Sequence, residues 1–180
     1  MLQRAVTRLV TFVIISLIVS GCGTTSRALN LDTRVELDFR VWNDLNPDDS
    51  GRASPLVVRF YELRDPRAFE SEDFIGIYEE DSDRLGDDMI TKRKLREFEP
   101  GESRIEEFVV DPSTRYIGLF GEFVQYENAN ARVVVPVKPN QKTSQLITLK
   151  NLSLLFQEYK EETEVERKPI VQPNPYHVGD

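Results

Sequence analysis

Apolar and polar residues alternate along several stretches of the chain, which is the pattern of β-strands with one buried face. The clearest case is residues 35–41, where apolar side chains alternate with charged ones over seven positions. Because successive side chains of a strand point to opposite faces, this alternation predicts a half-buried strand. Residues 56–63 are more uniformly apolar and rich in β-branched and aromatic residues, which predicts a more deeply buried strand.

Further strands are predicted where short apolar runs lie between turn-forming residues. They cover residues 90–98, 105–110, 116–126, 132–138 and 146–156, the last as one long strand or two short ones. Pro136 has no backbone N–H to donate, so its strand is expected at the edge of a sheet. The total of about seven or eight strands, with closely spaced turns, is typical of a β-sandwich.

One short helix is predicted across residues 66–80, inserted early among the strands. Asp65 is expected to cap this helix and Pro66 to occupy its first position, since both residue types are favoured there. Phe74 and Ile77 recur at helical spacing and are expected to form its apolar face.

The N-terminal residues have the pattern of a targeting sequence and are set apart from the fold. Arg4 and Arg8 lead into an apolar run of 11 residues, Leu9 to Val19. This run is shorter than the roughly 20 residues that a membrane-spanning helix needs. A basic start followed by a short apolar stretch and small residues is typical of a secretory signal peptide. We therefore expect residues 1–21 to be a signal peptide, with an uncleaved anchor helix as the alternative.

The segment Val19-Ser20-Gly21-Cys22 resembles the bacterial lipobox. The resemblance implies cleavage before Cys22, the only cysteine of the chain, and acylation of the new N-terminus, whereas the alternative is a buried free cysteine. More than one acyl chain anchors a protein stably. In enterobacterial lipoproteins, an Asp directly after the lipidated cysteine keeps the protein from the outer membrane. Here Gly23 holds that position, so the resemblance implies sorting to the outer membrane. The small, polar residues 22–30 are expected to form a lipidated tether.

Composition narrows the chemistry that the chain could perform. Among 180 residues, 31 are acidic and 23 basic, and the net charge of -8 argues against a broad nucleic-acid surface. One Cys and one His leave no Cys-rich zinc site and little room for histidine-based catalysis. His177 lies in residues 160–180, whose charged and Pro-rich sequence predicts a flexible tail. No catalytic residue, cofactor, metal site or small-molecule substrate is predicted.

A long loop between the first two predicted strands is the candidate binding segment. Residues 43–55 are rich in turn-forming residues and exceed the about two to five residues of a usual hairpin connection. Trp42, just before the loop, is either a rim-packing residue or an interface anchor. Leu45 is expected to be exposed among polar neighbours. The expected partner-binding residues are Trp42, Asn43, Asp44, Leu45, Asn46, Pro47, Asp48, Asp49, Ser50, Gly51 and Arg52.

Four further motifs follow one another in a characteristic order. They are Ser50-Gly51-Arg52-Ala53-Ser54-Pro55 leading into Leu56-Val57-Val58-Arg59-Phe60-Tyr61-Glu62-Leu63, the segment Phe69 to Phe74, the turn Pro100-Gly101-Glu102, and Tyr116-Ile117-Gly118. With these motifs, the chain resembles the TssJ lipoproteins of the bacterial type VI secretion system. The resemblance covers roughly residues 20–157.

The resemblance implies a transthyretin-like β-sandwich with an added helix, here over residues 31–159. It also implies an outer-membrane lipoprotein of the TssJ–TssL–TssM membrane complex, on the periplasmic face. Its first inter-strand loop, carried over to residues 43–55, would contact the periplasmic part of TssM, and TssL would be reached indirectly. Two alternatives stay open: a periplasmic β-sandwich lipoprotein that binds another envelope protein, and a carboxylate-based hydrolase.

Overall fold

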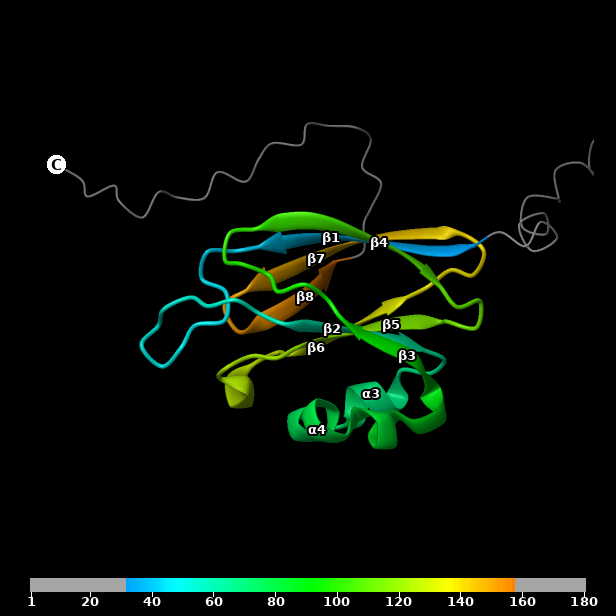
Figure 1. Cartoon of the computed structure of the whole chain (residues 1–180), viewed down its shortest axis with the longest axis horizontal. Helices are drawn as coiled ribbons and strands as arrows, with labels where there is room; N and C mark the ends of the chain where they lie inside the picture. The colour runs from blue at the N-terminus through cyan, green and yellow to red at the C-terminus, as the bar shows by residue number, and fades with distance from the viewer. Residues whose placement is uncertain (1–31, 158–180) are drawn as a thin grey trace, which may run out of the picture.

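The computed structural model describes residues 32–157, which form two four-stranded sheets packed face to face (Figure 1). The strands are β1 (Thr33–Val41), β2 (Val58–Leu63), β3 (Met89–Lys94), β4 (Ser103–Val110), β5 (Tyr116–Gly121), β6 (Arg132–Pro136), β7 (Lys142–Lys150) and β8 (Ser153–Gln157). The predicted β-sandwich is therefore confirmed. The expected signal peptide, Cys22, the tether of residues 22–30 and the tail of residues 160–180 lie outside the described residues.

The strand order is β4-β1-β7-β8 in the first sheet and β3-β2-β5-β6 in the second. β1 pairs antiparallel with β4 and parallel with β7, so that Asp38 lies opposite both Ile105 and Leu146. β6 lies at a sheet edge, as Pro136 predicts. Since β1 and β2 belong to different sheets, the connection between them crosses from one layer to the other.

Aromatic side chains fill the space between the two sheets. The inward-facing residues of β1 are buried and its outward-facing residues are more exposed, which confirms the alternation expected for residues 35–41. The ring centroid of Phe39 on β1 lies 4.5 Å from that of Phe98, and Phe60 on β2 lies 4.3 Å from Phe108 on β4. These contacts bury apolar surface from both sheets in one core.

Two helices cover the outer face of the second sheet, where the sequence predicted one across residues 66–80 (Figure 1). They are α3 (Arg67–Ser71) and α4 (Phe74–Leu85), followed by the short 3-10 helix η1 (Gly86–Asp88). The predicted helical insertion is present, but it is divided in two, because Asp73 has an extended backbone and begins a new helix. Its carboxylate accepts the N–H of Gly76 at 2.7 Å, as an N-cap residue does.

Several strand ends differ from the predicted ones. The strand expected from residue 56 begins at Val58, because Leu56 forms only an isolated bridge with Phe98. The strand expected through residue 126 ends at Gly121, whose carbonyl accepts the N–H of Phe123 at 3.0 Å and turns the chain. The 3-10 helix η2 (Tyr126–Asn128) follows.

β1 runs along the sandwich from one end to the other (Figure 1). Its nine residues span roughly 26 Å at about 3.3 Å per residue. Thr33 therefore lies at one end of the domain, and the connection between β1 and β2 (cyan in Figure 1) projects at the opposite end. Residues 43–55 of this connection, called the first loop below, form the candidate binding segment.

Candidate partner-binding site

Leu45 fixes the first loop to the core. Its side chain is fully buried, so the prediction that it is exposed was wrong. The Leu45 N–H donates to the carbonyl of Trp42 at 3.3 Å, and the Leu45 carbonyl accepts the N–H of Ser54 at 3.1 Å. These bonds bring the two ends of the loop together and turn the apolar side chain inward. Leu45 thus positions the loop and offers no surface to a partner.

Asn46 holds the same part of the loop through buried polar contacts. It is 2% exposed, and its φ of 46° lies in the left-handed region that Asn adopts more readily than most residues. Its Nδ2 donates to the carbonyl of Pro55 at 2.8 Å, and its Oδ1 accepts the N–H of Val124 at 2.9 Å. Its backbone N–H donates to the carbonyl of Asn151 at 2.8 Å. Asn46 therefore ties the base of the loop to the loop's own far end at Pro55 and to two other segments, at Val124 and Asn151.

The tip of the first loop is organised around the carboxylate of Asp48. This carboxylate accepts the backbone N–H groups of Ser50 at 2.8 Å and Arg52 at 3.0 Å, and the Nε of Arg52 at 2.9 Å. The hydrogen bond from the backbone of Arg52, followed by that from its guanidinium, lowers the pKa of Asp48. Gly51 permits the turn with a φ of 75°. The tip is therefore a defined, hydrogen-bonded turn.

The predicted contact residues divide into three groups by exposure. Leu45 and Asn46 are buried. Half-buried residues are Trp42, Pro47 and Asp48, and exposed residues are Asn43, Asp44, Asp49, Ser50, Gly51 and Arg52. A partner that approaches this end of the domain would meet the exposed group first.

Trp42 forms the base of the site. Its N–H donates to the carbonyl of Leu149 at 2.9 Å, and its carbonyl accepts the N–H of Gly101 at 3.3 Å. Lys150 Nζ lies 4.1 Å from the centroid of the indole ring, a cation–π contact. The half-buried indole is consistent with rim packing, while its role as an interface anchor stays a prediction.

A supporting segment that the sequence analysis did not identify lies between β5 and β6. Gln125 Nε2 donates to the carbonyls of Pro47 at 3.1 Å and Asp48 at 3.0 Å. Val124, beside it, is 56% exposed. No local pattern indicates this contact, because the apolar residues within 116–126 predict one continuous strand.

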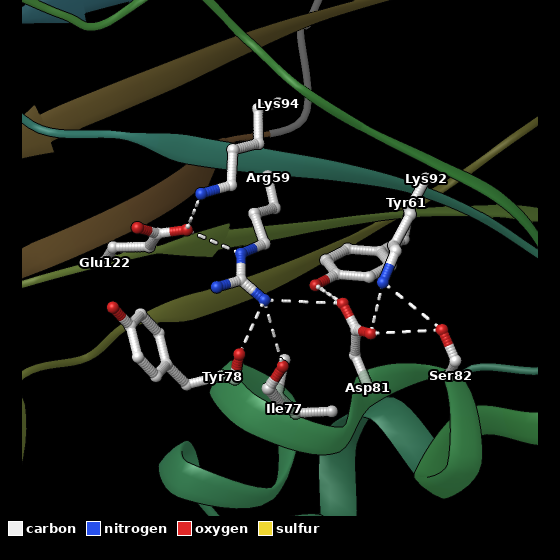
Figure 2. Close-up of polar contacts among 9 residues, drawn as sticks. All are labelled: Arg59, Tyr61, Ile77, Tyr78, Asp81, Ser82, Lys92, Lys94 and Glu122. Carbon is white, nitrogen blue, oxygen red and sulfur yellow. Dashed lines mark hydrogen bonds and ion pairs between the residues drawn. The ribbon is translucent and has the colours of Figure 1, made fainter.

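A second polar cluster joins α4 to the second sheet (Figure 2). Arg59 on β2 donates through Nε to Glu122 at 2.6 Å, and through Nη1 to the carbonyls of Ile77 at 3.2 Å and Tyr78 at 2.9 Å. α4 is kinked at Glu80, whose φ of -127° is not helical. Arg59 therefore supplies hydrogen bonds to carbonyls just before the kink, where the regular helical pattern is interrupted.

Asp81 lies at the centre of this cluster, with a side chain that is 6% exposed. Its carboxylate accepts the hydroxyl of Tyr61 at 2.9 Å and the Nζ of Lys92. Burial disfavours ionisation of Asp81, but the hydrogen bonds from Lys92 and Tyr61 outweigh it and lower the pKa of Asp81. Burial raises the pKa of the Tyr61 hydroxyl. At neutral pH the buried pair is therefore an ionised Asp81 that accepts from a neutral Tyr61.

Metal-binding clusters and membrane-spanning helices are both absent from the part of the chain that the structure describes. Within residues 32–157, no group of three or more His, Cys, Asp or Glu side chains is arranged to hold a metal ion. In the same range, no helix has the length and apolar character to span a membrane. Cys22 and His177, the single cysteine and histidine, lie outside it.

Comparison with known families identifies the fold and its biological context. Residues 33–152 match the family model described as "Type VI secretion lipoprotein, VasD, EvfM, TssJ, VC_A0113". The chain belongs to this family of type VI secretion lipoproteins. The TssJ family is a lipoprotein family of a secretion system and is not a known class of enzymes. No curated protein matches the sequence.

Solved structures of type VI secretion proteins have the same fold. The T6SS lipoprotein TssJ1 from Pseudomonas aeruginosa aligns with a TM-score of 0.67 and 27% identity, covering 73% of this chain and 99% of its own. Lip from Serratia marcescens, described as a membrane bound component of the Type VI Secretion System, aligns with a TM-score of 0.63 and 18% identity, covering 69% of this chain and 97% of its own. A chain of the structure described as "T6SS protein TssM C-terminal domain (869-1107)" from EAEC aligns with a TM-score of 0.58 and 23% identity, covering 69% of this chain and 98% of its own.

Proposed function

We propose that this protein is the outer-membrane anchor of a type VI secretion membrane complex and docks the periplasmic part of TssM through its first loop. Membership of the TssJ family supports the assignment to this secretion system. The similarity to Serratia Lip, a membrane bound component of that system, supports a place at a membrane. The aligned chain of the EAEC structure is shorter than the TssM segment, residues 869–1107, that the structure's description names, because 69% of this chain covers 98% of it. That chain is therefore a companion of TssM in the structure, and its similarity to this protein supports TssM as the partner. In this role the protein works by binding and needs no catalytic residue.

The placement of the two ends of β1 is the observation that carries the proposal (Figure 1). The chain from the lipobox cysteine, Cys22, enters the sandwich at Thr33, at one end of the domain. The first loop projects at the other end. Acyl chains on Cys22 would therefore hold one end of the domain near the membrane, while the first loop faces away from it toward a partner.

The internal bonds of the first loop favour tight docking. A flexible loop loses conformational entropy when it is ordered on binding, and a loop that is already ordered avoids part of this cost. Buried Leu45 and Asn46 fix the base of the loop, and Asp48 fixes its tip. The exposed side chains of the loop would therefore reach a partner in one geometry.

A charge change at the tip tests the docking surface without damage to the fold. Deletion of the whole loop would also remove Leu45 and Asn46, which the core needs. The double substitution Asp49→Lys and Ser50→Arg instead leaves the bonds to Asp48 in place, because Ser50 contributes only its backbone N–H to them. We expect binding to the periplasmic part of TssM, measured by calorimetry, to weaken about tenfold or more.

The matched control is Asp83→Lys with Ser71→Arg, which makes the same changes at exposed positions on the two helices. The control should bind within about twofold of the unchanged protein. Equal affinity of the tip variant and the control, with unchanged thermal unfolding of both, would exclude the first loop as the contact.

The membrane anchor is tested separately through Cys22. The substitution Cys22→Ser removes the thiol that lipidation requires, so the protein should move from the membrane fraction to the soluble fraction. The circular dichroism spectrum should stay the same, because the change lies outside the sandwich. Retention of the variant in membranes would contradict anchoring by acyl chains.

A further inference from the structure

β3 is an open edge of the second sheet. It pairs with β2 on one side, and in the described part of the chain no strand pairs with its other side. An open edge presents unpaired backbone N–H and C=O groups to which an extended peptide can add as a further strand. β3 lies beside α4, and the surface that it offers is separate from the first loop (Figure 1).

The backbone of Lys92 and Lys94 points toward this open side. Just beyond β3, the N–H of Leu95 donates to the carbonyl of Val58 on the β2 side at 2.9 Å. In an antiparallel pair the residues that bond to the neighbouring strand alternate with residues whose backbone groups point away from it. Lys94 and Lys92, one and three positions before Leu95, are therefore the residues whose N–H and C=O groups face outward.

The side chains near this edge are mainly cationic. A groove of about 310 Å³ is lined by Arg59, Asp81, Lys92, Arg93 and Lys94. Three carboxylates pair with its four cations: Asp81 with Arg59 and Lys92, Glu122 with Arg59 and Lys94, and Glu62 with Arg93. The side chains of Lys92 and Lys94 are 43% and 63% exposed. One positive charge is left over at this edge, in a chain whose net charge is -8. Lys94, which shares Glu122 with Arg59, is the side chain most available to an acidic ligand.

Lys92 and Lys94 also define the spacing of that ligand. Being two positions apart in one strand, they point to the same face, roughly 7 Å from each other. Both reach toward the α4 side, where Lys92 contacts Asp81 and Lys94 contacts Glu122 at 3.3 Å (Figure 2). An added strand with acidic residues at every second position would place its carboxylates at the same repeat.

We propose that β3 accepts an extended acidic segment of a partner protein by strand addition, with carboxylates at alternate positions beside Lys92 and Lys94. The outward backbone groups bind the main chain of the segment, and the lysines select for its charge. Lysines on an edge strand also discourage pairing with neutral strands, which is the protective role they play in many sheets. Binding of a specific acidic ligand goes beyond that role, and the two can be separated by experiment.

The test uses the full-length protein in detergent and a fluorescent probe peptide of the sequence Glu-Val-Glu-Val-Glu-Val-Glu. Fluorescence anisotropy should show saturable binding that weakens at high salt, and a Lys-Val peptide of the same length should not bind. A Glu-Val peptide that is N-methylated at every second residue keeps its charge but cannot form the ladder. We expect it to bind about tenfold more weakly or not at all.

Substitutions at Lys94 separate charge from backbone pairing in the protein itself. Lys94→Ala removes one charge and should weaken binding about threefold, whereas the control Lys138→Ala, at an exposed site elsewhere, should have no effect. Lys94→Pro also removes the outward N–H without breaking a bond to β2, and should weaken binding about tenfold. If Lys94→Pro does not fold, the N-methylated peptide makes the same distinction.

Three results would overturn the proposal. The first is no binding of the Glu-Val probe, which would leave only the protective role of the lysines. The second is equal binding of the N-methylated and unmodified probes, which would reduce the site to charge attraction. The third is tighter binding of a peptide of residues 160–166 of this chain, whose sequence is also acidic, because it would assign the edge to this protein's own C-terminal segment, in the same or a second copy, in place of a different protein.

Discussion

The side-chain Oδ1 of Asn46 accepts a hydrogen bond from the backbone N–H of Val124 at 2.9 Å, joining two loops that are 78 residues apart in sequence. The Nδ2 of the same side chain bonds to Pro55 across the first loop. One buried amide therefore connects both ends of the first loop to the β5–β6 connection.

Asn46→Ala should lower the free energy of unfolding by about 3 kcal/mol. The substitution removes two hydrogen bonds at about 1 kcal/mol each and places Ala in the left-handed region at a further cost of about 1 kcal/mol. Urea denaturation measures the change. Asn140→Ala is the control, because Asn140 also has a positive φ, 57°, but is only half-buried. Its free energy of unfolding should fall by about 1 kcal/mol, the cost of the left-handed backbone alone. Equal costs at both sites would show that the side-chain bonds of Asn46 do not stabilise the loop.

The stability of the sandwich should depend on the ionisation of Asp81 in acid. Because the folded state lowers the pKa of Asp81 below the ordinary value of 3.8, its contribution is fully present above that pH. The contribution is lost as the pH falls below 3.8 and through the folded-state pKa. Asp81→Asn should cost about 3 kcal/mol at pH 7, and its difference from the unchanged protein should shrink toward pH 2.

The measurement is the free energy of unfolding between pH 7 and pH 2. Asp83→Asn, at an exposed position of the same helix, serves as the control. Its free energy of unfolding should equal that of the unchanged protein at every pH. A difference between Asp81→Asn and the unchanged protein that stays constant with pH would contradict the proposed ionisation.

Arg59→Lys should loosen α4 while keeping the positive charge. Lys has no planar fork and cannot bond at once to Glu122 and to the helix carbonyls, so we expect a loss of about 2 kcal/mol. Hydrogen exchange of the α4 amides should become faster. The control is Arg84→Lys. Because the Arg84–Glu80 pair is exposed, this substitution should lower the free energy of unfolding by less than about 0.5 kcal/mol. Unchanged exchange in α4 would show that Arg59 does not hold the kink.

Gly118→Ala should destabilise the contact between α3 and the second sheet. A Cβ at this position would lie 2.9 Å from Phe69 Cζ and 3.1 Å from Leu63 Cδ1, which forces one neighbour to move. Overpacking of this kind costs about 2 kcal/mol, measurable by thermal unfolding. Phe69→Leu in the Gly118→Ala background should recover part of the loss, because it removes the ring that the new methyl group meets. A second substitution that only adds to the loss would place the strain elsewhere.

Much of the sandwich is predictable because its strands carry local patterns. The alternation in residues 35–41 reports directly on two faces with different burial, and Pro136 correctly predicts a sheet edge. The first loop is also evident from its turn-forming residues. The TssJ motifs are local strings as well, and they lead to the family that the comparison confirms.

The rest of the site depends on contacts between segments that are far apart in sequence. Leu45 looks exposed in a polar loop, yet backbone bonds to Trp42 and Ser54 turn it into the core. The Arg59–Asp81–Lys92 cluster brings together β2, α4 and β3, and no pattern within any one element indicates it. The break between α3 and α4 has a local cause in the Asp73 cap, which the sequence analysis missed.

The course of β1 has a mechanical consequence under the proposed function, in which acyl chains on Cys22 hold one end of the domain and a partner binds the first loop at the other. A pull between the N-terminal end of β1 and the first loop runs along the strand, whose hydrogen bonds to antiparallel β4 are perpendicular to it and whose hydrogen bonds to parallel β7 are slanted. Under such a load these bonds are sheared together and do not open one after another. The central strand is therefore placed to carry tension through the domain without unzipping it.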